Sequence, residues 1–206
     1  MLFAGADPDL RVISIAYVDN AGLLAGFFLY RYPSKDRGVD RSELLNWGVH
    51  TAAFCRQPSM SACVEYPRIR PDTPNRQSLV ELAVIAGALA GNLDAKMVLP
   101  MEWKGSIPKH IHQARVYATQ GWDFKQVKTK GTKYAYPIGK AYQDRLNSCW
   151  TIVDGELLEA GVEKSLPNSV WKDLGDSLGL AVHAQCVFEA QTKELPPGHL
   201  RYPTRQ

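Results

Sequence analysis

Cysteine is scarce in this sequence, and the few cysteines form no metal-binding or redox pattern. The four are Cys55, Cys63, Cys149 and Cys186, and they include no Cys-x-x-Cys pair and no neighbouring pair of histidines. This spacing argues against a zinc site and against a thioredoxin-type motif. We therefore expect four reduced thiols that are buried as small apolar side chains.

Long hydrophobic runs are also missing. The longest, residues 21–30, is well short of the roughly 20 residues that a membrane-spanning helix needs. The first residues contain no basic stretch and reach Asp7 before an apolar core can form, which is not typical of a secretory signal. We expect a cytoplasmic protein, in the host cytoplasm if the chain is viral, with no membrane partner.

The chain has no strong excess of charge of either sign. It carries 24 Lys and Arg against 21 Asp and Glu, a net charge of +3 that neither indicates nor excludes nucleic acid. Its 206 residues, 45% of them apolar, are enough for one globular domain with a core. The charge is uneven only in residues 124–143, which hold five lysines and no acid.

The spacing of apolar residues predicts an α/β fold. The expected elements are strands at residues 2–6, 11–18 and 23–30, a helix capped by Asp40 or Ser42, a strand at 61–65, a helix at 75–91, a strand at 96–99, and helices at 107–120 and 168–191. This order is that of a ribonuclease H-like five-stranded mixed sheet, three antiparallel then two parallel strands, flanked by helices. We expect a single domain over residues 1–195, with a basic insertion at about 121–167 and a mobile tail at 196–206.

Four carboxylates lie at the ends of two predicted strands and on the last predicted helix. Asp7 ends the first strand and Glu65 ends the fourth. Asp173 and Asp176 are three residues apart on the last helix, so they lie about 60° apart around it and about 4.5 Å apart along its axis. The pattern predicts that all four side chains meet at one site.

Carboxylates gathered in this way repel one another, so protonation or bound cations must relieve the repulsion. Ligands that are all oxygen favour Mg²⁺, or Mn²⁺ in its place, over zinc. Two such ions about 3.5–4 Å apart would activate a water and stabilise the leaving oxygen in phosphodiester hydrolysis. The residues thus predict a metal-dependent nuclease.

The segments around these carboxylates resemble the RuvC-type Holliday-junction resolvases, especially those of bacteriophages. The matching segments are residues 6–12 (ADPDLRV), Val64-Glu65, Ser78-Leu79, Ala86-Gly87, residues 100–109 (PMEWKGSIPK) and residues 173–180 (DLGDSLGL). The resemblance implies a homodimeric endonuclease that cuts four-way DNA junctions with paired nicks. It also implies that Asp7, Glu65, Asp173 and Asp176 are the catalytic residues that bind the metal ions.

Three features depart from the family pattern. Asp9 stands where a glycine is common after the first Asp-Pro, and we expect Asp9 to be a turn residue rather than a ligand. Arg68 stands where family members often have an aromatic wedge, and Tyr66 is the nearest aromatic residue. Residues 121–167 also exceed the usual spacing before the last motif.

Basic residues near these motifs are candidates for DNA contacts. The predicted set is Arg11, Arg68, Lys104, Lys109, Lys125, Lys128, Lys130 and Lys133. The lysine-rich segment is either a solvated loop or a flexible arm whose lysines neutralise phosphates and whose aromatic rings stack on unpaired bases. We expect Trp103 to be a packing residue, His110 and His112 to lie on the surface, and His183 to be structural.

Other interpretations remain open. The same fold serves nucleases for flaps, concatemers or RNA–DNA hybrids, and the chain could also be a catalytically silent protein that binds branched DNA. Each carboxylate has a structural alternative: a turn cap for Asp7, an ion pair with Arg68 or Arg70 for Glu65, and a solvated helix face for the last two. An actin-like sugar kinase shares the first five strands but needs a duplicated domain and glycine-rich phosphate loops, and the chain has neither.

Overall fold

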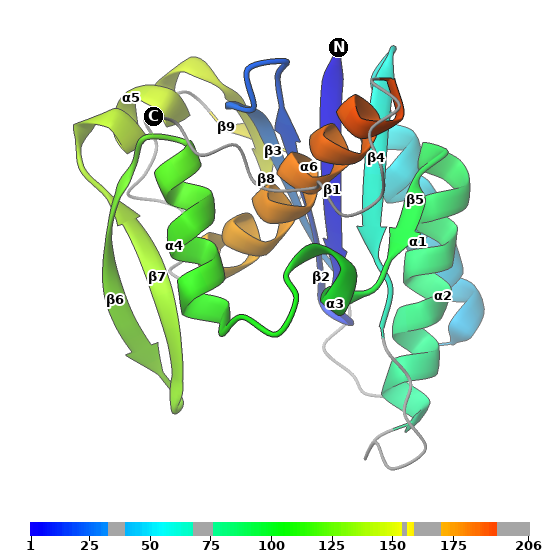
Figure 1. Cartoon of the computed structure of the whole chain (residues 1–206). Helices are drawn as coiled ribbons and strands as arrows, with labels where there is room; N and C mark the ends of the chain where they lie inside the picture. The colour runs from blue at the N-terminus through cyan, green and yellow to red at the C-terminus, as the bar shows by residue number, and fades with distance from the viewer. Residues whose placement is uncertain (33–39, 68–75, 154–155, 159–169, 193–206) are drawn as a thin grey trace.

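The centre of the fold is a seven-stranded mixed sheet (Figure 1). The computed structural model describes residues 1–32, 40–67, 76–153, 156–158 and 170–192. The sheet order is β5-β4-β1-β2-β3-β8-β9. Its strands are β1 (Leu2–Pro8), β2 (Val12–Val18), β3 (Leu24–Arg31), β4 (Met60–Glu65), β5 (Lys96–Val98), β8 (Trp150–Val153) and β9 (Glu156–Leu158).

The predicted ribonuclease H-like core of this sheet is confirmed. Strands β1, β2 and β3 are antiparallel neighbours, while β4 is parallel to β1 and β5 is parallel to β4. The chain extends the five-stranded sheet at the free edge of β3, where β8 pairs in parallel and β9 follows antiparallel. The extension comes from residues that the sequence left without an assigned fold.

Helices cover both faces of the sheet. In Figure 1, α6 crosses one face diagonally with α3 and α4 on the same side, and α1 and α2 cover the other face. Two separate apolar clusters fill the space between the sheet and these layers. The helices are α1 (Arg41–Cys55), α2 (Arg76–Leu93), α3 (Pro100–Trp103), α4 (Lys109–Thr119), α5 (Lys140–Ser148) and α6 (Val170–Thr192).

Alternation along β1 decides which way its acid points. Ala4 and Ala6 belong to the apolar cluster beneath α1 and α2, whereas Phe3 belongs to the cluster beneath α6. Because successive side chains of a strand point to opposite faces, Asp7 shares the α6 face with Phe3 and Gly5. The acid at the end of β1 therefore lies beneath the last helix.

The same alternation applies to β4. Ala62 and Val64 face α1 and α2, while Cys63 faces α6, so Glu65 also points to the α6 side. Since β4 runs parallel to β1, the two acids end their strands at the same edge of the sheet. The fold brings Asp7 and Glu65 together because of strand direction and register.

Gly5 allows α6 to lie directly on β1. A Cβ at this position would be 2.2 Å from both the carbonyl oxygen of Ser177 and the backbone nitrogen of Ala181. No side chain fits in that space, so the contact requires glycine. This close approach sets the height of α6, and of its acids, above the end of β1.

Residues 124–143 form regular structure, which corrects both expectations for this segment. Strands β6 (Asp123–Thr129) and β7 (Thr132–Ile138) pair as an antiparallel hairpin, separate from the main sheet, and α5 follows directly. The two turn residues, Lys130 and Gly131, both have positive φ, 48° and 84°, as a tight two-residue hairpin turn requires. The segment is thus neither a solvated loop nor a flexible arm.

The end of helix α2 differs from the sequence prediction. Helix α2 continues past residue 91, where the predicted helix ends, to Leu93, because the buried Leu93 side chain packs into the cluster beneath α1 and α2. The Asn92 amide also donates to the carbonyl of Ala88 in the preceding turn. Helix α1 begins as predicted, with Asp40 accepting a hydrogen bond from the backbone of Ser42.

The structure agrees with most of what the sequence predicts for the cysteines and for membrane-spanning helices. All four cysteines are free thiols, and three are buried while Cys186 is partly exposed. Within the described ranges, no helix is long and apolar enough to cross a membrane. The predicted tail at 196–206 lies outside the described residues.

Candidate active site

The ends of β1 and β4 and the start of α6 border a pocket of about 370 Å³. All four predicted carboxylates line it, together with Lys104, which follows α3, and Lys109, the first residue of α4. The polar lining residues are Asp7, Asp9, Glu65, Ser78, Lys104, Lys109, Asp173 and Asp176. The structure therefore brings to one place residues that are up to 169 positions apart in the sequence.

Asp7 sits where its negative charge is disfavoured. Burial raises the pKa of this carboxyl well above its ordinary value, and the nearby charges of Asp176 and Glu65 raise it further. Burial likewise raises the pKa of Asp173 to about 6, and Asp176 and Asp9 add to that effect. A group of acids with raised pKa values attracts a cation, which would stabilise their charged forms.

Lys109 supplies positive charge at Asp176. Its ammonium group forms an ion pair with Asp176, whose side chain is only 6% exposed. Burial alone would lower the pKa of Lys109, but the carboxylates of Asp176 and Asp7 raise it. The lysine is thus held in its charged form against the acids.

Glu65 is held by the segment that precedes α4. The indole N–H of Trp103 donates to Glu65 over 2.7 Å, and the ammonium of Lys104 donates to the same oxygen over 3.3 Å. Glu102 is used elsewhere, because it caps its own short helix by accepting from the backbone N–H of Leu99. Trp103 is buried, as expected of a packing residue, and it also orients an acid of the pocket.

Sequence analysis missed Gln113, which contacts Asp176 from α4. Its side-chain amide donates to the carboxylate of Asp176 over 3.4 Å and to the carbonyl of Lys172 over 3.3 Å. Gln113 is four residues after Lys109 and four before Tyr117, so all three share one helix face. That spacing is the signal that points to Gln113, once α4 is known to face the acids.

The glycines of α6 mark the contact between α4 and the acids. A Cβ at Gly175 would be 2.7 Å from the hydroxyl of Tyr117, and one at Gly179 would be 2.6 Å from the His112 ring. His112 is therefore buried, with a pKa lowered to about 4, chiefly by burial, and is not a surface residue as expected. It packs edge-on against Trp103, whose indole donates to Glu65.

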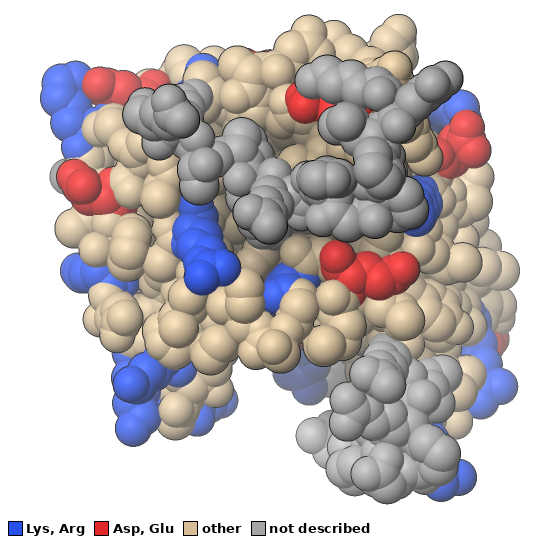
Figure 2. Space-filling view, in the orientation of Figure 1, with Lys and Arg blue, Asp and Glu red and all other residues tan. Residues whose placement is uncertain are grey.

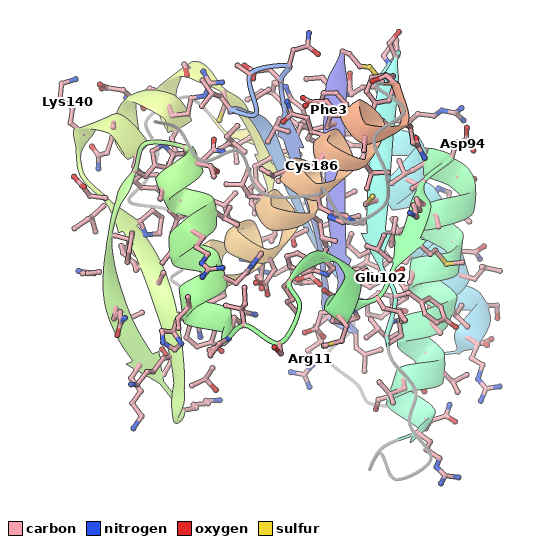
Figure 3. All side chains as sticks on the ribbon, viewed as in Figure 1. Phe3, Arg11, Asp94, Glu102, Lys140 and Cys186 are labelled. Atoms are coloured by element: carbon pink, nitrogen blue, oxygen red, sulfur yellow. The ribbon has the colours of Figure 1, made fainter. Side chains whose placement is uncertain are left out.

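The remaining predicted DNA contacts lie in several places. Arg11 is exposed at the same end of the sheet as the end of β1 (Figure 3), and Arg68 lies outside the described residues. The backbone N–H of Asp9 donates to Val12 in the turn between β1 and β2, as expected, and its side chain also lines the pocket. The lysines of residues 125–133 are on the β6–β7 hairpin.

The donor set of this pocket fits a hard divalent cation in its chemistry. Its acidic side chains offer carboxylate oxygens, and burial together with the neighbouring acids raises the pKa values of Asp7 and Asp173. Within the described ranges, no three acid, histidine or cysteine side chains form a ready-made metal cluster. In this structure Lys104 and Lys109 provide the positive charge instead.

We predict that Lys109→Gln makes stability depend more strongly on Mg²⁺. Removing the ammonium leaves the buried Asp176 without its ion pair, which costs about 1–2 kcal/mol because Lys109 is itself 37% exposed. In the presence of a metal chelator, thermal unfolding of Lys109→Gln should show a Tm about 2–8 °C below that of the parent. Added Mg²⁺ should raise the Tm of the variant more than that of the parent.

Lys96→Gln is the matched control, since Lys96 is exposed on the edge strand β5. It should leave both the Tm and its response to Mg²⁺ unchanged. An equal response to Mg²⁺ in parent, control and Lys109→Gln would contradict the idea that the lysine occupies the place of a cation.

Comparisons with known proteins give structural likenesses only. No family model and no curated protein sequence matches the chain. Thermus thermophilus RuvC in complex with a Holliday junction substrate is 12% identical, with a TM-score of 0.44 over 93% of this chain and 96% of that chain. Another T. thermophilus RuvC structure is 14% identical, with a TM-score of 0.42 over 94% and 97%.

A different protein is also similar in structure. Ethanolamine utilization protein EutJ from Carboxydothermus hydrogenoformans is 13% identical, with a TM-score of 0.34 over 96% of this chain and 73% of that chain. At identities of this order, the likenesses concern the arrangement of helices and strands and not a shared activity.

Proposed function

We propose that this protein is a divalent-cation-dependent, structure-selective endodeoxyribonuclease that resolves Holliday junctions or other branched DNA. The observation that carries the proposal is the pocket at the ends of β1 and β4, where the four predicted carboxylates converge with Asp9 and two lysines. Acids with raised pKa values next to lysines are the combination expected where cations and phosphates bind together. The preference for branched DNA comes from the resemblance of the sequence motifs to RuvC-type resolvases.

In this proposal Asp7, Glu65, Asp173 and Asp176 would hold two Mg²⁺ ions, or Mn²⁺ in their place. When bound, these ions would activate a water and stabilise the 3′ leaving oxygen of the cut strand. Trp103 and Gln113 orient two of the acids through the hydrogen bonds that they donate. Those bonds reduce the freedom of the carboxylates before any ligand arrives.

Lys104 and Lys109 have a second role in the proposal. Each now pairs with an acid of the pocket, and each would be released toward the scissile phosphate when cations neutralise those acids. A lysine ammonium binds phosphate as a point charge and carries no sequence information. Arg11, at the same end of the sheet, would extend this contact along the backbone.

The proposal includes a homodimer built from one nuclease domain per chain. A four-way junction presents two equivalent strands, so one pocket in each of two subunits related by a two-fold axis would cut both. Two nicks made within the lifetime of one complex are the expected sign of this arrangement.

A panel of DNA shapes tests the selectivity. An immobile four-way junction, a Y-fork, a 5′ flap, a linear duplex and an RNA–DNA hybrid, matched in sequence, are incubated separately with the protein and Mg²⁺. We expect paired, symmetric nicks on the junction at a rate at least about tenfold above that on the linear duplex. Faster cutting of flap or hybrid would reassign the substrate, and tight junction binding without any cutting would indicate a silent binding protein.

A further inference from the structure

The β6–β7 hairpin carries a cluster of lysines without acidic partners. Lys125, Lys128, Lys130 and Lys133 are all exposed. Among the described residues, none of their ammonium groups forms an ion pair with a carboxylate, in contrast to Lys104, Lys109 and Lys140. Figure 2 shows basic side chains gathered at the lower left of the molecule, over the turn of the hairpin.

The hairpin register places two of these lysines directly opposite each other. Lys128 pairs across the strands with Lys133, next to the turn at Lys130 and Gly131. Like charges in directly opposed positions destabilise a hairpin, so this arrangement is unfavourable for folding alone. An anionic ligand with closely spaced charges would remove the repulsion.

The hairpin is continuous with the pocket through Tyr134. The ammonium of Lys109, which pairs with Asp176, lies 5.5 Å from the centre of the Tyr134 ring, and that of Lys172 lies 4.6 Å from it. On the same face of the hairpin, Lys125 lies 5.2 Å from the centre of the Tyr136 ring. On this face a path of positive charge leads from the acids of the pocket to Lys125. Lys128 and Lys133 lie on the other face of the hairpin, so the two sets of lysines meet only at the turn, at Lys130.

Gln113 fixes the hairpin relative to the pocket. It is fully buried, and its side-chain oxygen accepts a hydrogen bond from the backbone N–H of Ala135 in β7. The amide nitrogen of the same side chain donates to Asp176. One buried side chain therefore links the strand that bears Tyr134 to an acid of the site.

We propose that the β6–β7 hairpin is a binding surface for the phosphate backbone of duplex DNA, placed so that it holds the DNA next to the pocket. This inference rests on the proposed function, because it assigns the hairpin to the substrate of that pocket. From Tyr134 to Lys130 the hairpin is four residues long, about 13 Å. Phosphates of one strand are spaced about 3.4 Å along the duplex axis, so the surface spans about four of them.

DNA binding measured in the presence of a metal chelator tests the hairpin independently of cleavage, because the proposed cleavage needs divalent cations. Fluorescence anisotropy with a linear duplex and with a four-way junction gives Kd at several salt concentrations for the parent and for Lys128→Gln/Lys133→Gln. Each lost phosphate contact lowers the slope of log Kd against log salt by about 0.9. We expect the double variant to bind both DNAs about tenfold more weakly, with a slope lower by about 2.

A control variant with the same loss of charge shows whether the effect is specific to the hairpin or comes from the general electrostatic attraction between the protein and DNA. Lys96→Gln/Lys140→Gln removes two exposed lysines, one on β5 and one at the opposite end of the hairpin from its turn (Figure 3). It should change Kd less than about threefold. The double variant of the hairpin should also have a Tm at or above that of the parent, because the opposed charges are gone.

The outcomes separate this inference from the proposed function. Parent-like Kd and salt slope in the hairpin variant would overturn the inference, and so would an equal loss of affinity in the control. With either result, cleavage of DNA by the parent protein would still support the proposed active site in the pocket. If the parent binds but never cuts, the proposed function fails, while the salt slopes still decide whether the hairpin binds DNA.

Discussion

Asp7→Asn is expected to abolish cation-dependent DNA cleavage while making the protein more stable. The charge of Asp7 is disfavoured in the folded state, as its raised pKa shows, because the side chain is buried beside Asp176 and Glu65. A folded-state pKa above the unfolded value means that the charged form opposes folding at neutral pH. A neutral amide removes that penalty, so the free energy of unfolding should rise by about 0.5–2 kcal/mol.

The same substitution removes an oxygen donor from the proposed cation site. Metal ions stabilise the transition state of phosphodiester hydrolysis by several kcal/mol, and about 4 kcal/mol corresponds to about 10³-fold in rate. Single-turnover nicking of a junction should therefore slow by at least about 10³-fold. The Kd for DNA in chelator should stay within about threefold of the parent value, since the lysines remain.

The matched control for this prediction is Asp94→Asn. Asp94 is exposed, far from the pocket (Figure 3), and has a positive φ of 53° that asparagine adopts readily. It should leave both Tm and nicking rate unchanged. Cleavage at the parental rate by Asp7→Asn would remove Asp7 from the site, and a large fall in Tm would show that its charge is structurally required.

Gly5→Ala is expected to have the largest effect on stability. The new Cβ would meet two backbone atoms of α6 at 2.2 Å, and backbone atoms cannot rotate away as a side chain can. Helix α6 would have to move off β1, at a cost of about 3 kcal/mol or more in the free energy of unfolding. Thermal unfolding should show a Tm about 6–12 °C below that of the parent.

The movement should also separate the acids. Asp173 and Asp176 are on α6 and Asp7 is on β1, so a shift of the helix changes their spacing and should slow cleavage in molecules that still fold. Gly87→Ala is the control, because a Cβ at that exposed position in α2 would meet no atom within 4 Å. Alanine there should raise stability by up to about 1 kcal/mol. Equal Tm values for the two variants would refute the close contact between β1 and α6.

Much of the fold could be predicted because short-range patterns determine it. Residues 2–6 are a nearly continuous apolar run, typical of a strand covered on both faces, and the helix with Asp173 and Asp176 has apolar residues at helical spacing. The order of these elements limits how they can be joined into one sheet. The shared location of the acids then follows from strand direction, which is why the pocket could be anticipated before any coordinates.

Features that depend on contacts between distant segments could not be predicted. The β6–β7 hairpin contains six exposed residues in succession at its turn end, residues 128–133, so its alternation of apolar and polar residues is weak. Gln113 and His112 are polar residues on a mostly polar helix, and only the packing of α6 through Gly175 and Gly179 makes them buried. Strands β8 and β9 also depend on a distant segment, because β8 pairs with the edge of β3 and β9 pairs with β8.

Nicking of one immobile four-way junction, with and without Mg²⁺, tests the central claim most directly. A linear duplex of the same sequence and the Asp7→Asn variant run beside it, and the ends of the products are mapped on both strands. We predict paired nicks at symmetric positions, only with Mg²⁺, only on the junction, and absent in the variant. Cleavage that persists in chelator, or that Asp7→Asn leaves intact, would contradict a cation-dependent site at these carboxylates.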